Sequence, residues 1–307
     1  MQIHKGFESF QSNKKTTVTT GTFDGVHLGH SKILNQLIKV GKETDTETVL
    51  FTFLSHPRTV LFPDSNLKVI NSLEENISLF QSFKIDHLII HDFDKKFSRI
   101  TSLEYIRDIL VKKINMNNLI IGFNHNFGRN REGSFNELVE YEELFNFKIH
   151  KVEARFINQK SISSTKIRDA INKGLVDLAN NYLGYNFTIH GKVIKGRGRG
   201  RDLGFPTANL LLKKTNKIIP LKGVYIVNVI FKGDIYQGMI NIGNNPTFDS
   251  AKPSIEVHIF KFNQNIYNEY LEVQFIKRIR SEKKFSNVEE LNRRPEAKNF
   301  YWKINNF

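Results

Sequence analysis

The sequence predicts an α/β protein in two parts, a mostly parallel β-sheet covered by helices followed by a small antiparallel β-barrel. Up to about residue 185, apolar strand-like runs alternate with segments of helical periodicity, which is typical of a parallel sheet. From Phe187 onward the helical pattern stops, and short apolar runs are separated by Gly, Asn, Asp and Pro, which indicates a barrel. The 307 residues are enough for two domains. We place them at residues 1–184 and 185–307.

The first half begins with a strand in the Thr-rich run from Thr16, and a helix is expected from about His27 because apolar residues then recur at helical spacing. Further strands are expected in the runs ETVLFTFL, DHLIIH, NLIIGF and FKIHKV, and helices near residues 72–82, 101–114, 134–145 and 164–182. Three helix starts have the spacing of a capping box, in which a hydroxyl residue and a glutamate three positions later bond each other's backbone N–H groups: Ser72 with Glu75, Thr101 with Glu104, and Ser134 with Glu137.

The turn between Gly21 and His27 is the first candidate site. An Asp-Gly pair within it supplies turn chemistry, and the positive end of the following helix points into the turn. His27 and His30 share one face of the first helical turn, and Gly29 between them leaves the backbone approachable. Anions bind readily at such a helix start, so we expect a nucleotide-phosphate site. The alternative is that two surface histidines merely flank a helix start.

Two other loops should converge on that turn, since ligands in such sheets bind beyond the carboxyl ends of the strands. One is the Gly- and Arg-rich segment 122–133, which follows an apolar strand. The other is the segment from Ser163 to Arg168, in which hydroxyl groups stand at a helix start and Arg168 lies about one turn further on. A polar surface loop and a plain helix cap are the structural alternatives.

The second half contains the string GKVIKGRGRGRDLGFPTANL, residues 191–210. Alone, GRGRGR could bind RNA electrostatically, but its position between two strands favours a loop that covers phosphates. It is not a Walker-type P-loop, which needs Gly-x-x-x-x-Gly-Lys-Ser/Thr. Further on, Glu256 and His258 share one face of a predicted strand, while Ile255 and Val257 share the other.

Composition restricts the possible functions. A net charge of +14 and a pI near 9.7 favour an anionic partner, either nucleic acid or small phosphates, although lysine-rich solvated surfaces are also common. The absence of cysteine excludes disulfides, thiolate metal sites and a cysteine nucleophile. The sequence has no apolar run long enough to span a bilayer and no signal peptide pattern, so we expect a cytoplasmic protein.

The string GTFDGVHLGH, residues 21–30, resembles the signature of a nucleotidyltransferase superfamily. Together with the two loops, it resembles the adenylyltransferase half of the prokaryotic bifunctional riboflavin kinase/FMN adenylyltransferase (FAD synthetase) family. GRGRGRDLGFPTAN, GMINIGNNPT and SIEVH resemble the kinase half. The resemblance covers nearly the whole chain. It implies a Rossmann-like nucleotidyltransferase domain over residues 1–184 and a barrel-shaped riboflavin kinase domain with a closing helix over residues 185–307.

The resemblance implies two reactions: riboflavin and ATP give FMN, and FMN and ATP then give FAD and pyrophosphate, with Mg²⁺ accompanying ATP. The expected partners are ATP, riboflavin and FMN, with neither nucleic acid nor membrane, and self-association is left open. Three alternatives remain. Only one activity could be live, the chain could be a flavin-sensing or nucleic-acid-binding regulator, or it could adenylylate another phosphomonoester.

The resemblance also assigns residues. His27 and His30 would stabilise ATP phosphates, and Glu256 would take the proton of the riboflavin 5′-hydroxyl. The residues implied to bind ATP or its phosphates are Gly21, Phe23, Gly29, Asn124, Ser164, Thr165, Arg168, Gly196, Gly200, Arg201, Thr207 and Asn209, of which Thr207 and Asn209 would also hold Mg²⁺. The flavin-binding candidates are His56, Pro57, Arg58, Arg280 and Phe285. The sequence departs from the family pattern at Ser55, His125, Asn268 and residues 292–295.

Overall fold

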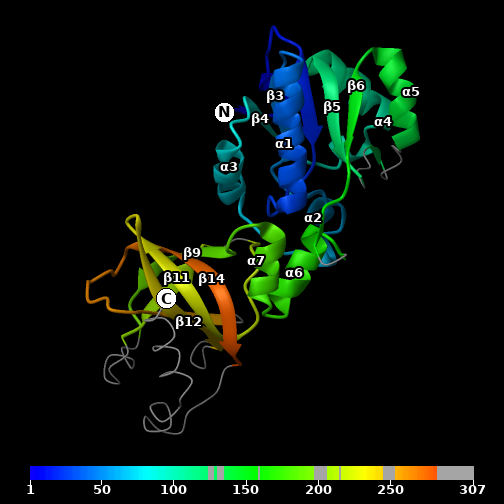
Figure 1. The fold of residues 1–307 in the computed structure, drawn as a ribbon. Coiled ribbons are helices and arrows are strands. Elements are labelled where there is room, and N and C mark those ends of the chain that lie inside the picture. The colour runs from blue at the N-terminus through cyan, green and yellow to red at the C-terminus, as the bar shows by residue number, and fades with distance from the viewer. Residues whose placement is uncertain are drawn as a thin grey trace. The chain divides into compact units, whose positions relative to one another are not determined.

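The computed structural model describes residues 1–123, 128–129, 135–157, 160–196, 206–213, 216–244 and 253–281. The chain forms two compact units, each with its own β-sheet (Figure 1). The first, which we name the parallel-sheet unit, contains Met1–Ile171, Leu178–Tyr185 and Thr215–Ile218. The second, the barrel unit, contains Asn172–Asp177, Asn186–Lys214 and Ile219–Phe307.

The sheet of the first unit has six parallel strands in the order β1-β4-β3-β2-β5-β6. The central strand β2 is buried along its whole length, with Val18 opposite Val49 on one side and Leu119 on the other. The strands are β1 (Gln2–Lys5), β2 (Thr16–Thr20), β3 (Glu47–Phe53), β4 (His87–His91), β5 (Met116–Gly122) and β6 (Lys148–Val152). Strand β1 was not indicated by the apolar pattern, and neither was the short β7–β8 pair (Phe156–Ile157 and Lys160–Ser161).

Helices cover both faces of this sheet (Figure 1). Alternating residues of β3 face opposite ways, so Leu50 packs with the helix α1 while Val49 and Phe51 pack with η4. The helices are α1 (Leu28–Glu43), α2 (Pro57–Leu61), α3 (Leu73–Ser82), α4 (Ser102–Glu104), the π-helix η4 (Tyr105–Lys113), α5 (Phe135–Phe145), α6 (Ser164–Asn172) and α7 (Val176–Leu183), with short 3₁₀ turns at Phe7–Ser9, Pro63–Ser65 and Phe97–Arg99.

The helix starts follow the capping chemistry of the sequence. The capping boxes predicted at Ser72 and Thr101 are both present, with each hydroxyl and its glutamate bonding the other's backbone N–H. The third, at Ser134, lies outside the described residues. Because these bonds join residues only three positions apart, the sequence predicts them well.

Two predicted helices differ from the structure. The segment near 101–114 starts as α4 but continues as a π-helix, in which Ile114 N–H donates to Ile109 O rather than to residue 110. The segment near 164–182 is two helices, because Gly174 between them has φ +74°, a conformation that ends a helix. An added Cβ at Gly174 would lie 2.6 Å from Arg278 Cδ, so the close approach also requires glycine.

The second unit is a closed barrel of six antiparallel strands in the order β10-β13-β12-β11-β14-β9. Burial alternates along β11, so that Tyr225, Val227 and Val229 fill the interior. The strands are β9 (Thr188–Ile194), β10 (Ala208–Leu212), β11 (Gly223–Phe231), β12 (Asp234–Asn244), β13 (Pro253–Ile259) and β14 (Tyr270–Arg280). The parallel sheet and the barrel confirm the predicted fold class. The closing helix that the family resemblance implies lies outside the described residues.

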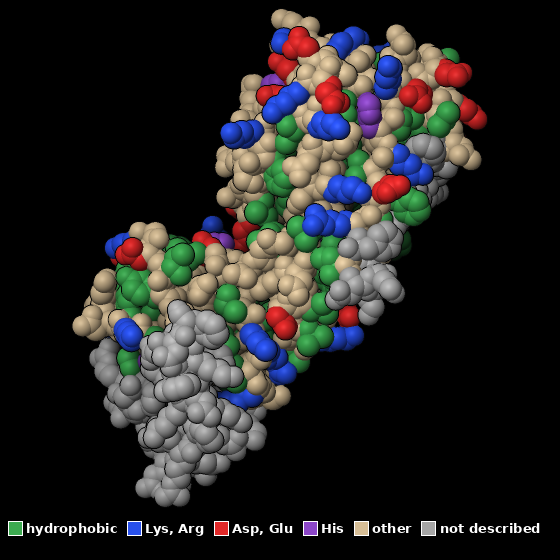
Figure 2. Space-filling model, viewed as in Figure 1, with side chains coloured by type: hydrophobic (Ala, Val, Ile, Leu, Met, Phe, Trp, Pro, Cys, Tyr) green, Lys and Arg blue, Asp and Glu red, His purple; other side chains and the backbone are tan. Residues whose placement is uncertain are grey.

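The described part of the chain has no helix that combines the length and apolarity needed to cross a membrane. On the face of the parallel-sheet unit that Figure 2 shows, described lysine and arginine side chains are interspersed with acidic ones and do not gather into one patch.

Candidate active sites of the two units

In the parallel-sheet unit, the chain turns sharply between β2 and α1. Phe23 and Val26 have positive φ values of 45° and 34°, and Gly25 has φ +81°. His27 caps α1, because its Nδ1 accepts a hydrogen bond from the His30 backbone N–H at 3.3 Å. The predicted turn and helix start are therefore both present.

The rings of His27 and His30 lie on one face of the first helical turn, as their spacing predicts. They are stacked, with centroids 3.6 Å apart and 13° between their planes. A Cβ on Gly29 would lie 3.1 Å from the His27 ring, closer than nearly all side-chain contacts. Glycine at this position therefore leaves room for the stacked pair.

Both histidines are held neutral at pH 7. The pKa of His27 is lowered to about 4, mainly by burial and to a smaller extent by the Arg168 cation. Burial also lowers the pKa of His30 well below its ordinary value, and the His27 ring adds to this effect. Since His27 Nδ1 accepts a hydrogen bond, the proton of the neutral ring is on Nε2. His30 Nδ1 is buried and has no hydrogen-bond partner in the described part of the chain.

Asp24 connects this turn to α6. Its buried carboxylate accepts a hydrogen bond from Arg168 Nη2 at 2.7 Å, and its backbone carbonyl accepts one from Ser164 Oγ at 3.0 Å. Arg168 Nε is buried and has no partner among the described residues. Thr165 is exposed beside Ser164. The first turn and the start of the helix at 164 thus meet as predicted, while Asn124 and most of the loop after Phe123 lie outside the described residues.

The other predicted residues of this unit shape the turn or lie near it. The Phe23 ring is buried with its centroid 5.1 Å from that of His30, and a Cβ on Gly21 would lie 3.2 Å from the Phe23 ring. His56 caps α2, which begins at Pro57, by accepting the Arg58 N–H at 3.1 Å. Burial lowers the pKa of His56, and Arg168 lowers it further, so the α2 cap lies within electrostatic reach of the Arg168 cation.

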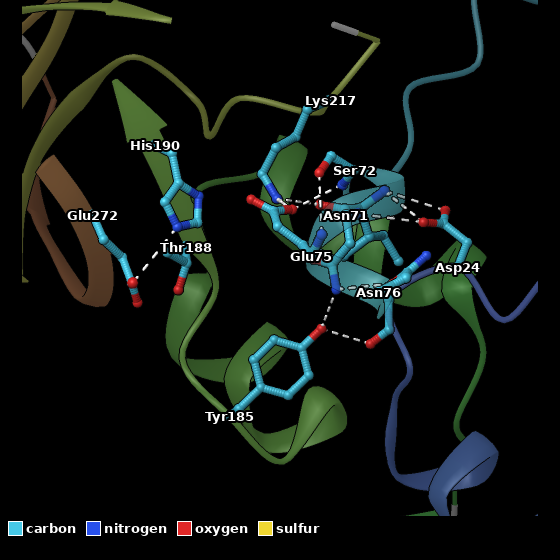
Figure 3. Close-up of polar contacts among 12 residues, drawn as sticks. Asp24, Asn71, Ser72, Glu75, Asn76, Tyr185, Thr188, His190, Lys217 and Glu272 are labelled. Atoms are coloured by element: carbon cyan, nitrogen blue, oxygen red, sulfur yellow. Dashed lines mark hydrogen bonds and ion pairs between the residues drawn. The ribbon is translucent and has the colours of Figure 1, made fainter. Parts of the chain in front are cut away.

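Two residues that hold this turn were missed by the sequence reasoning. Asp24 was treated only as a turn residue, although its position in the turn after a buried strand was an available signal. Tyr185 was not considered at all. Its hydroxyl donates to Gly25 O at 2.6 Å and accepts from Asn71 Nδ2 at 2.7 Å (Figure 3). No local pattern indicates a bond between residues 160 positions apart.

In the barrel unit, β13 places Glu256 on the outer face, whereas Ile255 and Val257 are buried inside. The predicted division of this strand into two faces is therefore confirmed. Glu256 lies opposite Asn209 of β10 in the antiparallel register, and opposite Asn241 of β12 on its other side. Directly opposed residues point to the same face, so two amides flank the carboxylate.

Two contacts position the start of β10 and the residue before it, Thr207. Gly196, just after β9, lies against the Asn209 amide so closely that an added Cβ would meet Asn209 Nδ2. His258 Nδ1 donates to the Pro206 carbonyl at 2.8 Å, and this holds the segment before the exposed Thr207 against β13. The sequence reasoning noted His258 only for its strand face.

Of the remaining predicted residues of the barrel unit, the structure describes Arg280. Arg280 ends β14 and pairs with Val224 of β11, and neither strand is a neighbour of β10 in the barrel. Its Nη1 donates to Ser281 O at 3.3 Å. Gly200, Arg201 and Phe285 lie outside the described residues.

The described residues contain no cluster of three histidine or acidic side chains that could hold a metal ion by themselves. Thr207, Asn209 and Glu256 nevertheless offer oxygen ligands on one side of the barrel. Mg²⁺ prefers oxygen and is usually held by one or two protein groups together with substrate phosphates and water. The residues present therefore fit a magnesium ion that arrives with ATP.

Two family models match the chain one after the other, FAD synthetase over residues 9–166 and riboflavin kinase over residues 183–297. A bifunctional riboflavin kinase/FMN adenylyltransferase from Buchnera aphidicola subsp. Schizaphis graminum is 38% identical over 297 residues, which cover 95% of this chain and 94% of that protein. This chain belongs to the bifunctional riboflavin kinase/FMN adenylyltransferase family. The family resemblance predicted from the sequence is thus confirmed.

Another member of the family, from Haemophilus influenzae, is 36% identical over 275 residues and covers 89% of each chain. A crystal structure described as a macrolide-efflux protein from Streptococcus pneumoniae has a TM-score of 0.89 and 30% sequence identity, and covers 99% of this chain and 98% of that one. The efflux function in its name is said of that protein; what this chain shares with it is sequence and fold.

Proposed function

We propose that the chain makes FMN in the barrel unit and FAD in the parallel-sheet unit, using ATP in both reactions. The observation that carries this proposal is where the two family matches lie. Each match falls mainly on one unit, and in each unit the described candidate residues lie together and are suited to phosphate chemistry. The cytoplasmic location and the absence of a nucleic-acid partner stay predictions.

For adenylyl transfer, a phosphate oxygen of FMN attacks the α-phosphorus of ATP, and pyrophosphate leaves. The neutral rings of His27 and His30 supply N–H donors at the start of α1, where the positive end of the helix adds to them. Arg168 adds a cation that the Asp24 carboxylate holds in place. Fixed donors of this kind stabilise charge that develops on phosphate oxygens without reorganising during the reaction.

For riboflavin phosphorylation, Glu256 takes the proton of the 5′-hydroxyl as that oxygen attacks the γ-phosphorus of ATP, and ADP leaves as the bond from the γ-phosphorus to the bridging oxygen breaks. Asn209 and Thr207 would hold Mg²⁺ with the ATP phosphates, and the ion would neutralise their charge. The Gly196 contact and the His258 bond to Pro206 fix these two residues beside the base. Neither reaction requires a covalent enzyme intermediate.

A product analysis tests the proposal directly. The purified chain is incubated with riboflavin, ATP and Mg²⁺, and FMN and FAD are resolved over time. We expect FMN to appear first and FAD to follow; the absence of both products would rule out the proposed function.

The assignment of the second step to the parallel-sheet unit is tested with His30→Ala, since the His30 side chain accepts no cap hydrogen bond. FAD formation from FMN should fall on the order of 10²–10³-fold, the usual effect of losing a fixed charge-stabilising donor. Riboflavin phosphorylation in the same sample should continue. A folded variant that forms FAD at the parental rate would remove His30 from the site.

A further inference from the structure

A short segment from the second half of the sequence belongs to the parallel-sheet unit. It lies in the connection between β10 and β11, and its described residues are 216–218. Asn216 O accepts a hydrogen bond from the Val69 N–H at 2.9 Å, and the Ile218 N–H donates to Val69 O at 2.8 Å. Ile218 is buried. The segment therefore forms a bridge beside the chain that leads into α3.

Lys217, at the centre of this bridge, is largely buried. Its ammonium donates to the Ile70 carbonyl at 2.8 Å and forms an ion pair with Glu75, the capping-box glutamate of α3 (Figure 3). Only 11% of the Lys217 side chain and 17% of the Glu75 side chain are exposed. A buried cation is stable only when paired and hydrogen-bonded, and here both conditions are met.

The segment that Lys217 contacts at Ile70 also binds the Asp24 carboxylate. The Ile70 N–H donates to the Asp24 carboxylate at 2.9 Å, and the Asn71 N–H donates to it at 3.3 Å. Two consecutive peptide groups thus connect the 216–218 bridge to Asp24. In the 69–70 peptide, the carbonyl accepts from Ile218 and the N–H donates to Asp24.

In the 70–71 peptide, the carbonyl accepts from the Lys217 ammonium and the N–H donates to the same carboxylate. A hydrogen bond accepted by a carbonyl polarises the peptide group and strengthens donation by its N–H, most of all when the donor is a cation. Lys217 is therefore connected through one peptide group to Asp24, and through Asp24 to Arg168 at 2.7 Å.

We propose that Lys217 is a positioning residue for adenylyl transfer, so that the second half of the sequence completes the phosphate site of the first. This inference rests on the proposed function of that site. Lys217 acts through the Ile70–Asn71 peptide and Asp24, which together orient the Arg168 guanidinium toward the ATP phosphates.

The test uses the full chain with a double variant, Lys217→Met with Glu75→Gln. Methionine removes the ammonium at similar length, and glutamine avoids a buried unpaired carboxylate while keeping an oxygen for the Ser72 N–H. We expect kcat/KM for ATP in FAD formation to fall about tenfold, mainly through a higher KM, because displaced phosphate contacts weaken binding and alignment. Riboflavin phosphorylation in the same preparation should stay within about twofold of the parent.

Lys112→Met is the matched control. Lys112 also forms an ion pair, with Asp108 at 3.0 Å in the same unit, but 66% of its side chain is exposed. Its loss should change neither activity. Parental adenylylation kinetics in the folded double variant would overturn the proposal, as would an equal loss of both activities. A parent chain that forms FMN but never FAD would instead contradict the proposed function of the site.

Discussion

Glu256 is the residue on which the proposed kinase reaction depends most. Glu256→Gln keeps the size of the side chain and its place opposite Asn209 but removes the basic carboxylate. FMN formation should therefore fall by about 10²–10⁴-fold, the usual contribution of a positioned general base, while FAD synthesis from supplied FMN continues. Separate assays of the two steps measure this effect.

Glu272→Gln makes the same change elsewhere on the barrel. Glu272 lies on β14, where its carboxylate is 3.6 Å from His190 (Figure 3). Strand β14 is not a neighbour of β13, which carries Glu256. Both activities should survive this control. If Glu256→Gln phosphorylates riboflavin within a few-fold of the parent, another group takes the proton.

The buried His27 makes stability depend on pH. Its pKa is about 4 in the folded chain and about 6.5 when unfolded, so the unfolded chain binds more protons between these values. The contribution of His27 to the free energy of unfolding is therefore fully present above about pH 6.5 and is lost as the pH falls toward 4. Between pH 7.5 and pH 4.5, His27 alone should remove about 2–3 kcal/mol from the free energy of unfolding.

Denaturant unfolding of the parent and of His27→Asn at both pH values measures this contribution. Asparagine still accepts a hydrogen bond at a helix cap but does not titrate. The parent should lose more stability than the variant, because the other titrating groups are common to both. Equal losses would show that His27 is not held neutral by burial.

At the scale of the elements, the exit of β9 and the start of β10 lie close together, with Gly196 against the side chain of Asn209. Gly196→Ala places a methyl group where Asn209 Nδ2 lies, so the Asn209 amide must move away from its position beside Glu256. Riboflavin phosphorylation should fall at least about tenfold, since small misplacements of positioning groups are costly, and FMN adenylylation should be unchanged. Steady-state kinetics of the two steps decides this.

The adjacent exposed residue gives the control for this element. Lys195→Ala also introduces an alanine at the exit of β9 but adds no atom near Asn209. It should leave riboflavin phosphorylation near the parental rate. Full kinase activity in Gly196→Ala would mean that the Asn209 amide is not needed where the structure places it.

At the scale of the whole molecule, a cut near residue 184 removes residues from both units, but it removes none of the barrel strands. The barrel strands and Glu256, Asn209 and Thr207 all lie after this boundary. A fragment of residues 185–307 should therefore convert riboflavin to FMN and stop there, as a product analysis would show. A folded fragment that binds neither riboflavin nor ATP would mean that the first half completes the kinase site.

The complementary fragment of residues 1–184 should be a poor adenylyltransferase. It lacks Tyr185, which holds the Gly25 carbonyl, and the 216–218 bridge, which supports Asp24 through two peptide groups. Its rate of FAD formation should therefore be well below that of the intact chain when both are assayed at equal concentrations of FMN and ATP. Parental activity in this fragment would show that neither support is required.

The sequence alone determined features whose partners are close along the chain. Capping boxes at Ser72 and Thr101, the shared helical face of His27 and His30, and the division of the strand around Glu256 into two faces all follow from spacings of two or three residues. Such spacings have a fixed geometry in a helix or strand, so they could be predicted, together with the fold class.

Only the tertiary structure decided which distant groups hold the sites in place. Asp24 meets Arg168 across 144 positions, and Lys217 meets Ile70 across 147 positions. A distant neighbour, Arg278, also leaves no room for a side chain at Gly174. Buried polar groups must find hydrogen-bond partners, but local periodicity says nothing about which distant partner satisfies them. The fold makes that choice when it brings these segments together.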